Sequence, residues 1–124
     1  YPPAELIFPD GEEFWHTDIK WDYNIPFDFK EVTEPELRRK LQDEGRRMFQ
    51  AMGISGYGRC DIRVNEKGEL FILEINPNPA IMLPPKEYGP ADYMILYDKY
   101  GYKGFFDRIF GSAFLRQKMR SAGK

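Results

Sequence analysis

Apolar residues recur at helical spacing in residues 34–52, which predicts a helix there. The apolar positions that share one face are Leu37, Leu41, Met48, Phe49 and Met52. The stretch opens with Thr33-Glu34-Pro35-Glu36, which resembles a capping box with proline in the first turn. Gly53 is placed to end the helix, because glycine readily adopts the left-handed backbone conformation that follows a last turn. Further helical segments are predicted over residues 91–97 and 103–118.

Two short runs of strand-forming residues predict a β-hairpin in the middle of the chain. Residues 56–64 and 69–75 flank the turn sequence Asn65-Glu66-Lys67-Gly68. Each strand has an apolar set of alternate residues, and the two sets are expected to share the buried face, which restricts the register. The predicted apolar pairs are Cys60 with Ile75, Ile62 with Leu73, and Val64 with Phe71.

The start of the sequence predicts a second hairpin. Residues 4–8 form an apolar run, and an Asp10-Gly11 turn then leads into Phe14-Trp15-His16. Residues 17–32 lack a clean period and residues 76–90 contain five prolines, so both are predicted to be loops. The order of hairpin, helix, hairpin and helices predicts an α+β fold, with an antiparallel sheet and helices packed on one face.

Composition limits the class of protein. At 124 residues the chain is expected to form one domain over residues 1–124. One cysteine excludes an internal disulfide and a Cys-based zinc site, and a net charge of −2 argues against a general nucleic-acid binder. No apolar run approaches the ~20 residues of a membrane span. The chain starts at Tyr1 without a basic-then-apolar leader, so it is interpreted as a fragment or processed chain with a cytoplasmic location.

The polar face of the central hairpin carries the candidate chemistry. The predicted register places Asp61 directly across from Glu74, and Arg59 across from Asn76. Like charges in that arrangement are destabilising, so something must offset the repulsion. A nearby arginine, a shared proton, or a divalent cation held by Asp61, Glu74 and Asn76 would each do so. The alternative interpretation is that these are surface residues on a solvated sheet face.

The two strands also carry a family resemblance. Gly56-Tyr57-Gly58-Arg59-Cys60-Asp61, followed by Leu73-Glu74-Ile75-Asn76-Pro77-Asn78-Pro79, resembles the C-terminal half of an ATP-grasp ligase, in the D-alanine–D-alanine ligase branch. That family carries Arg-x-Asp on one strand and Glu-x-Asn on the next, and the thirteen-residue spacing from Asp61 to Glu74 is kept here. The similarity extends over residues 3–116.

The resemblance implies a role for each matching residue. Asp61 resembles the ligand of one Mg²⁺, Glu74 the carboxylate that bridges two, and Asn76 the amide that holds the second. Arg59 resembles the arginine that contacts the transferred phosphoryl group. Lys20 resembles the lysine of a mobile loop that closes over the γ-phosphate of ATP, and Trp21 replaces the tyrosine that usually follows it. Two Mg²⁺ ions, with ATP as co-substrate, are therefore implied.

The chain departs from that family in two places. The ligase branch follows its Glu-x-Asn motif with a Pro-Gly step and a Ser-Leu pair, whereas Pro79 is followed here by Ala80 and no serine comes after it. A different amine or small peptide is therefore expected as acceptor, in a pocket shaped by Lys86, residues 88–92 and the aromatic tail. The upstream lobe that holds the rest of ATP has no match here. It is expected in cis or in trans, and a homodimer is a further option.

Two functions follow from the resemblance. The first is the Mg-ATP-binding half of a carboxylate–amine ligase that forms an amide through an acyl phosphate, inactive without its other lobe. The second is a non-catalytic ATP-grasp remnant that serves as a binding or structural subunit. The aromatic excess favours the remnant, whereas the opposed carboxylates favour the ligase. A hydrolase that uses Asp61 and Glu74 is a third, weaker hypothesis.

Overall fold

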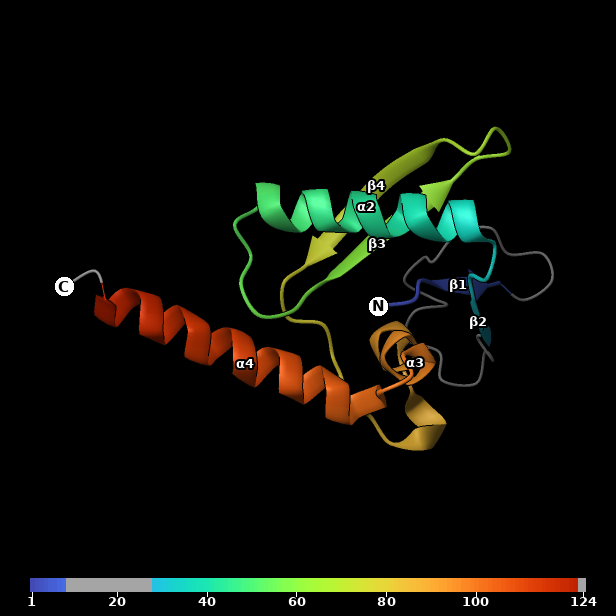
Figure 1. The fold of residues 1–124 in the computed structure, drawn as a ribbon. Coiled ribbons are helices and arrows are strands. Elements are labelled where there is room, and N and C mark those ends of the chain that lie inside the picture. Colours follow the sequence, from blue (N-terminus) through green and yellow to red (C-terminus); the bar gives the residue numbers. More distant parts are fainter. Residues whose placement is uncertain (9–27, 123–124) are drawn as a thin grey trace.

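A computed structural model describes residues 1–8 and 28–122. The elements in chain order are β1 (Ala4–Ile7), β2 (Asp28–Glu31), α2 (Pro35–Ala51), β3 (Arg59–Val64), β4 (Leu70–Asn76), the short 3-10 helix η1 (Pro85–Glu87), α3 (Pro90–Tyr97) and α4 (Gly101–Ala122). Within the described residues the strands form two antiparallel pairs, β1 with β2 and β3 with β4. The α+β class is confirmed (Figure 1).

The first strand pair differs from the sequence prediction. β1 pairs with β2, from Ala4 opposite Glu31 to Ile7 opposite Asp28, although residues 17–32 were predicted to be a loop. Packing explains the difference, because Phe29 is 8% exposed and Tyr97 donates a hydrogen bond of 2.7 Å to its carbonyl. The predicted hairpin through Phe14-Trp15-His16 lies outside the described residues.

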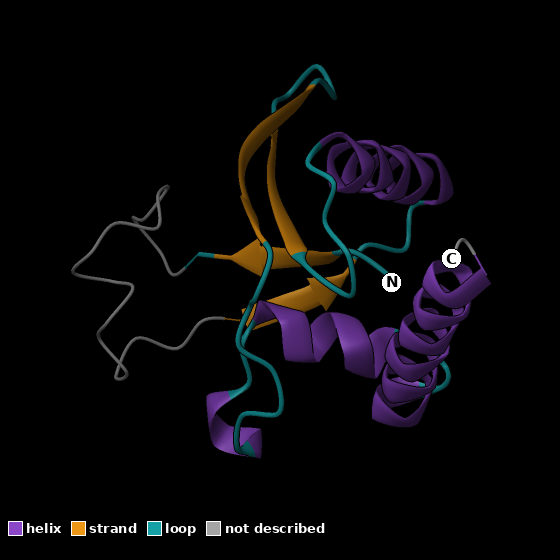
Figure 2. Ribbon diagram, turned by 90° about the vertical axis from the view of Figure 1, so that its left-hand side faces the viewer, coloured by secondary structure: helices purple, strands orange, loops and turns teal. Residues whose placement is uncertain are grey.

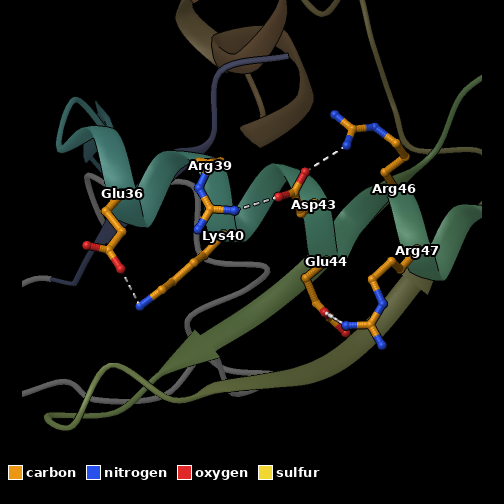
Figure 3. Close-up of polar contacts among 7 residues, drawn as sticks. All are labelled: Glu36, Arg39, Lys40, Asp43, Glu44, Arg46 and Arg47. Atoms are coloured by element: carbon orange, nitrogen blue, oxygen red, sulfur yellow. Dashed lines mark hydrogen bonds and ion pairs between the residues drawn. The ribbon is translucent and has the colours of Figure 1, made fainter.

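Helix α2 follows its predicted bounds closely but uses a different cap. Glu34, not Thr33, is the N-cap, and its carboxylate accepts hydrogen bonds from the backbone N–H groups of Glu36 and Leu37 at 2.9 and 2.5 Å. Gly53 adopts φ 63° just after the last turn, as a terminating glycine does. The exposed face carries ion pairs three or four residues apart, drawn in Figure 3.

The β3–β4 hairpin closes through a glycine turn. The side-chain oxygen of Asn65 accepts hydrogen bonds from the N–H groups of Lys67 and Glu69, at 3.0 and 2.9 Å. The Gly68 N–H donates a hydrogen bond of 2.9 Å to the Asn65 carbonyl. Gly68 adopts φ 74°, which residues with a side chain rarely adopt. The turn sequence therefore acts as predicted.

The register of this hairpin is correct in one half and wrong in the other. Cys60 lies opposite Ile75 as predicted, but a bulge follows Asp61, so that Ile62 faces Ile72 and Val64 faces Leu70. The predicted partners Leu73 and Phe71 are 66% and 51% exposed. The physical reason is that residues 70–73 are all apolar, so alternation does not fix which of them face inward.

The helices divide between the two strand pairs. Helix α2 packs against β3 and β4, whereas α3 packs against β1 and β2, as Figure 2 shows. The buried centre lies around α3 and the start of α4, with Phe29, Ala91, Ile95 and Phe105 as its apolar members. Helix α4 then runs outward from this centre (Figure 1). No helix in the described part of the chain is both long and apolar enough to cross a bilayer.

Candidate functional site

Four polar residues lie close together at the open end of the β3–β4 hairpin, away from its turn. Asp61 lies directly opposite Glu74, and Arg59 directly opposite Asn76, as the sequence predicted. The bulge begins immediately after Asp61, so this end keeps its own register. Because alternate residues of a strand share a face, β3 and β4 each contribute two of these side chains to the same side of the hairpin.

Arg59 holds the two opposed carboxylates together. Its Nε and Nη2 donate hydrogen bonds of 2.7 and 2.8 Å to the two oxygens of Asp61, in a fork geometry. The same Nη2 lies 3.6 Å from Oε1 of Glu74. The Arg59 side chain is 18% exposed, against 34% for Asp61 and 56% for Glu74. A nearby arginine, the first of the three expected remedies, therefore offsets the repulsion here.

Asn76 is oriented by the loop that follows it. Its Oδ1 accepts a hydrogen bond of 2.9 Å from the backbone N–H of Asn78, and Tyr57 Oη donates 2.8 Å to Oδ1 of Asn78. The two strands approach closely at Gly58, where an added Cβ would lie 3.1 Å from the Asn76 carbonyl and 3.2 Å from the Phe49 ring. A side chain at position 58 would therefore be crowded by both neighbours.

The donor set suits a hard divalent cation. Asp61 and Glu74 offer carboxylate oxygens, Asn76 offers an amide oxygen, and Mg²⁺ prefers such ligands. Within the described residues no three His, Cys, Asp or Glu side chains form a metal-binding group, so the amide would have to be the third donor. Both Asp61 oxygens already accept from Arg59. A cation at this position would thus compete with the guanidinium for the same carboxylate.

Lys20 and Trp21 lie outside the described residues, and their roles stay predictions.

Cys60 lies half-buried on the opposite face of β3. Burial raises the pKa of its thiol, and the negative charges of Asp61 and Glu44 raise it further, so the thiol stays protonated rather than nucleophilic.

Sequence reasoning missed the role of a buried carboxylate behind the loop. Asp92 is 0% exposed and accepts hydrogen bonds from the backbone N–H groups of Met82 and Gly89 at 2.6 and 3.2 Å, and from the Tyr102 hydroxyl. Burial, followed by the hydrogen bond to Asp92, raises the pKa of Tyr102. Met82 adopts φ 61°, which is unusual for a side chain of its size. Asp92 thus fixes residues 82–89 from the inside of the molecule.

Comparison with known proteins supports the resemblance seen in the motifs. The family described as D-ala D-ala ligase C-terminus matches residues 3–82, which include the whole β3–β4 hairpin. A D-alanine--D-alanine ligase from Acinetobacter baumannii strain ATCC 17978 is 37% identical over 81 residues, which are 64% of this chain and 24% of the relative. One from Geobacter sulfurreducens is 36% identical over 99 residues, covering 74% of this chain and 28% of the relative.

The matches cover most of this chain but only part of each relative. A D-alanine--D-alanine ligase from Acinetobacter baylyi, 33% identical over 81 residues, again matches over 24% of its length. The chain spans about a quarter of the length of the curated relatives it matches. No solved structure gives a significant match. Because the family match covers well over half of the 124 residues, the chain belongs to the D-ala D-ala ligase C-terminus family, an ATP-grasp family.

Proposed function

We propose that this chain is the metal- and phosphate-binding half of an ATP-dependent carboxylate–amine ligase. The observation that carries the proposal is the pairing of Asp61 with Glu74 next to Arg59 and Asn76. A purely structural hairpin has no need for two opposed carboxylates, because such a pair is destabilising by itself. Arg59 offsets the repulsion in the structure, and binding of a divalent cation would give the opposed pair a function.

The cation-binding role is proposed for three residues. Asp61, Glu74 and Asn76 would hold Mg²⁺, with two ions expected and the remaining positions filled by water and phosphate oxygens. The metal would supply charge neutralisation on the phosphoryl oxygens of ATP. Glu74 is the most exposed of the three charged residues at this site, at 56%, and is therefore the best placed to meet incoming ligands.

Arg59 would contribute the positive charge that the protein itself brings to phosphoryl transfer. In the reaction, a carboxylate oxygen of the substrate attacks the γ-phosphorus, the bond to ADP breaks, and an acyl phosphate forms. The amine nitrogen of the acceptor then attacks the acyl carbon, loses a proton, and expels phosphate. Because the guanidinium presents a planar fork of donors, Arg59 can pair with phosphoryl oxygens as it does with Asp61. It would stabilise charge that develops on them.

The other half of the nucleotide site is proposed to come from elsewhere. Lys20 would contact the γ-phosphate and Trp21 the nucleotide, as the family resemblance implies. An upstream lobe, in the same chain or in a partner, would hold the remaining phosphates and the adenine. The relatives are about four times as long as the segment they share with this chain, which leaves room for such a lobe.

The acceptor is proposed to differ from D-alanine. Ala80 stands where the ligase branch has glycine, and no serine follows, so the usual contacts to the second amino acid are missing. The backbone of the segment that would replace them is tied to Asp92 at Met82 and Gly89. An amine or small peptide is therefore proposed, in a pocket that includes Lys86 and Tyr88.

A non-catalytic subunit is the second candidate function, and α4 supplies the observation that favours it. Four large apolar side chains on this helix are strongly exposed: Phe110 at 58%, Phe114 at 70%, Leu115 at 65% and Met119 at 75%. Exposed apolar surface of this extent is typical of a face that another protein covers. Cation binding at the hairpin decides between the two candidates, because a purely structural subunit does not need it.

Titration with Mn²⁺, followed by electron paramagnetic resonance, tests the ligase proposal, because Mn²⁺ accepts the same oxygen ligands as Mg²⁺. The full chain should bind Mn²⁺ saturably, and Glu74→Gln should weaken binding at least about tenfold, because an uncharged amide oxygen replaces a carboxylate oxygen as ligand. Glu66→Gln removes the same charge from the exposed turn of the hairpin and should leave the affinity nearly unchanged. Failure of the wild-type chain to bind, or equal effects of the two variants, would refute the proposal.

A further inference from the structure

We propose that Tyr57 is a positioning residue for Asn76 and acts on it through Asn78. This inference rests on the proposed function, because it treats Asn76 as a cation ligand. Tyr57 precedes β3, whereas Asn76 ends β4 and Asn78 follows it, so the contact joins the two ends of the hairpin at the site. Its role would be to fix the direction in which the Asn76 amide oxygen is presented.

A continuous set of contacts leads from the buried centre to Asn76. The Tyr57 ring meets the Phe105 ring edge-on, with centroids 5.4 Å apart and an interplanar angle of 76°. Phe105 is 3% exposed, so this end of the path is anchored. The Tyr57 hydroxyl donates to Asn78 Oδ1 at 2.8 Å, and the Asn78 N–H donates to Asn76 Oδ1 at 2.9 Å.

The loop sequence leaves Asn78 as the only backbone donor beside Asn76. Pro77 and Pro79 flank it and have no N–H, so within residues 77–79 Asn78 alone can satisfy the Asn76 oxygen from the backbone. Proline also fixes its own φ and restricts the residue before it. The two prolines restrict the backbone around residue 78, and the Tyr57 hydrogen bond tethers the Asn78 side chain, so both constraints act on the residue whose N–H meets Asn76.

The hydrogen bond to Asn76 leaves capacity for a cation. An amide oxygen has two lone pairs, and the Asn78 N–H uses one of them. The second stays available for the cation that Asp61 and Glu74 would share. Partners that orient a metal ligand typically change metal affinity when they are removed, even though they never touch the metal.

Tyr57→Phe provides a clean test, because it removes one hydroxyl and keeps the ring against Phe105. We expect Mn²⁺ affinity to fall about threefold to tenfold, the range for loss of one exposed orienting hydrogen bond. Tyr97→Phe is the matched control, since it also loses one tyrosine hydrogen bond, of 2.7 Å to the Phe29 carbonyl, away from the hairpin. The control should bind Mn²⁺ as the wild-type chain does. Circular dichroism should show that both variants are folded.

A double-mutant cycle separates positioning from general destabilisation. Asn78→Ala should weaken binding, and adding Tyr57→Phe to it should have no further effect, because the two residues act in one path. Asn78→Asp keeps an oxygen for Tyr57 and should retain at least wild-type affinity. If the wild-type chain binds Mn²⁺ and Glu74→Gln weakens it, but Tyr57→Phe has no effect or equals Tyr97→Phe, the inference is overturned and the proposed function stands. If the wild-type chain does not bind, both fail.

Discussion

Replacing Arg59 with glutamine should destabilise the fold, because the guanidinium offsets the repulsion between Asp61 and Glu74. The variant removes two charge-assisted hydrogen bonds to Asp61 and a contact of 3.6 Å to Glu74. Such bonds are worth about 1.5–3 kcal/mol each when buried, but these side chains are partly solvated and their interaction is screened. We therefore expect a loss of about 2 kcal/mol in the free energy of unfolding. For a chain of this length that corresponds to roughly 8 °C in Tm.

A cation should replace the missing charge in this variant. Because Arg59 no longer occupies the Asp61 oxygens, Arg59→Gln should bind Mn²⁺ at least about fivefold more tightly than the wild-type chain. At ten times the Kd, binding would return about 1.4 kcal/mol of stability. The measurement is thermal unfolding by circular dichroism, with and without Mg²⁺, together with a Mn²⁺ titration.

Arg63→Gln is the matched control for the general effect of charge. Arg63 lies on the same strand, two residues beyond Asp61, and its removal changes the net charge equally. It should increase cation affinity less than Arg59→Gln does, since it does not hold the Asp61 oxygens in the fork described above. The proposed role of Arg59 in offsetting the carboxylate repulsion is refuted if Arg59→Gln unfolds at the wild-type temperature, or if its cation affinity is unchanged or lower.

Two further predictions concern the frame around the site. Asp92→Ala should lower the free energy of unfolding by about 3 kcal/mol, because it leaves two backbone donors and the Tyr102 hydroxyl without their buried acceptor. Tyr102→Phe should have a smaller effect in the same denaturant titration, and equal values would contradict this. The N–H groups of Leu37 and Glu36 lower the pKa of Glu34, so its contribution to stability is present above pH about 4.3 and is lost as pH falls through the lowered value. Glu34→Gln should therefore show a lower Tm near neutral pH, and the difference should shrink in acid; a constant difference would count against the cap.

Local signals made much of the site predictable. The parity of the two apolar sets and the position of the turn together predicted Asp61 opposite Glu74, and this pairing is observed. The turn at Asn65 and Gly68 was also predictable, since its side-chain and backbone hydrogen bonds depend only on residues within the turn. What these features share is that they are determined over a few neighbouring residues.

Features that depend on distant contacts were not predictable. Strand β2 has a single apolar residue, Phe29, and it becomes a strand through pairing with β1 and contact with Tyr97. The bulge after Asp61 was missed because residues 70–73 are all apolar, so the sequence does not show which of them face inward. The buried role of Asp92 was not predictable, because its three donors come from segments that only the folded chain brings together.

The open end of the β3–β4 hairpin is proposed to bind phosphate through a divalent cation. The most direct measurement is an NMR titration of the full chain with ATP, in the presence and absence of Mg²⁺, because NMR detects the weak binding expected of a half-site. Amide signals of residues 57–61, 74–76 and 78 should shift with ATP only when Mg²⁺ is present, and Glu74→Gln should remove the effect. Shifts that are absent, or that are the same without Mg²⁺, would contradict it.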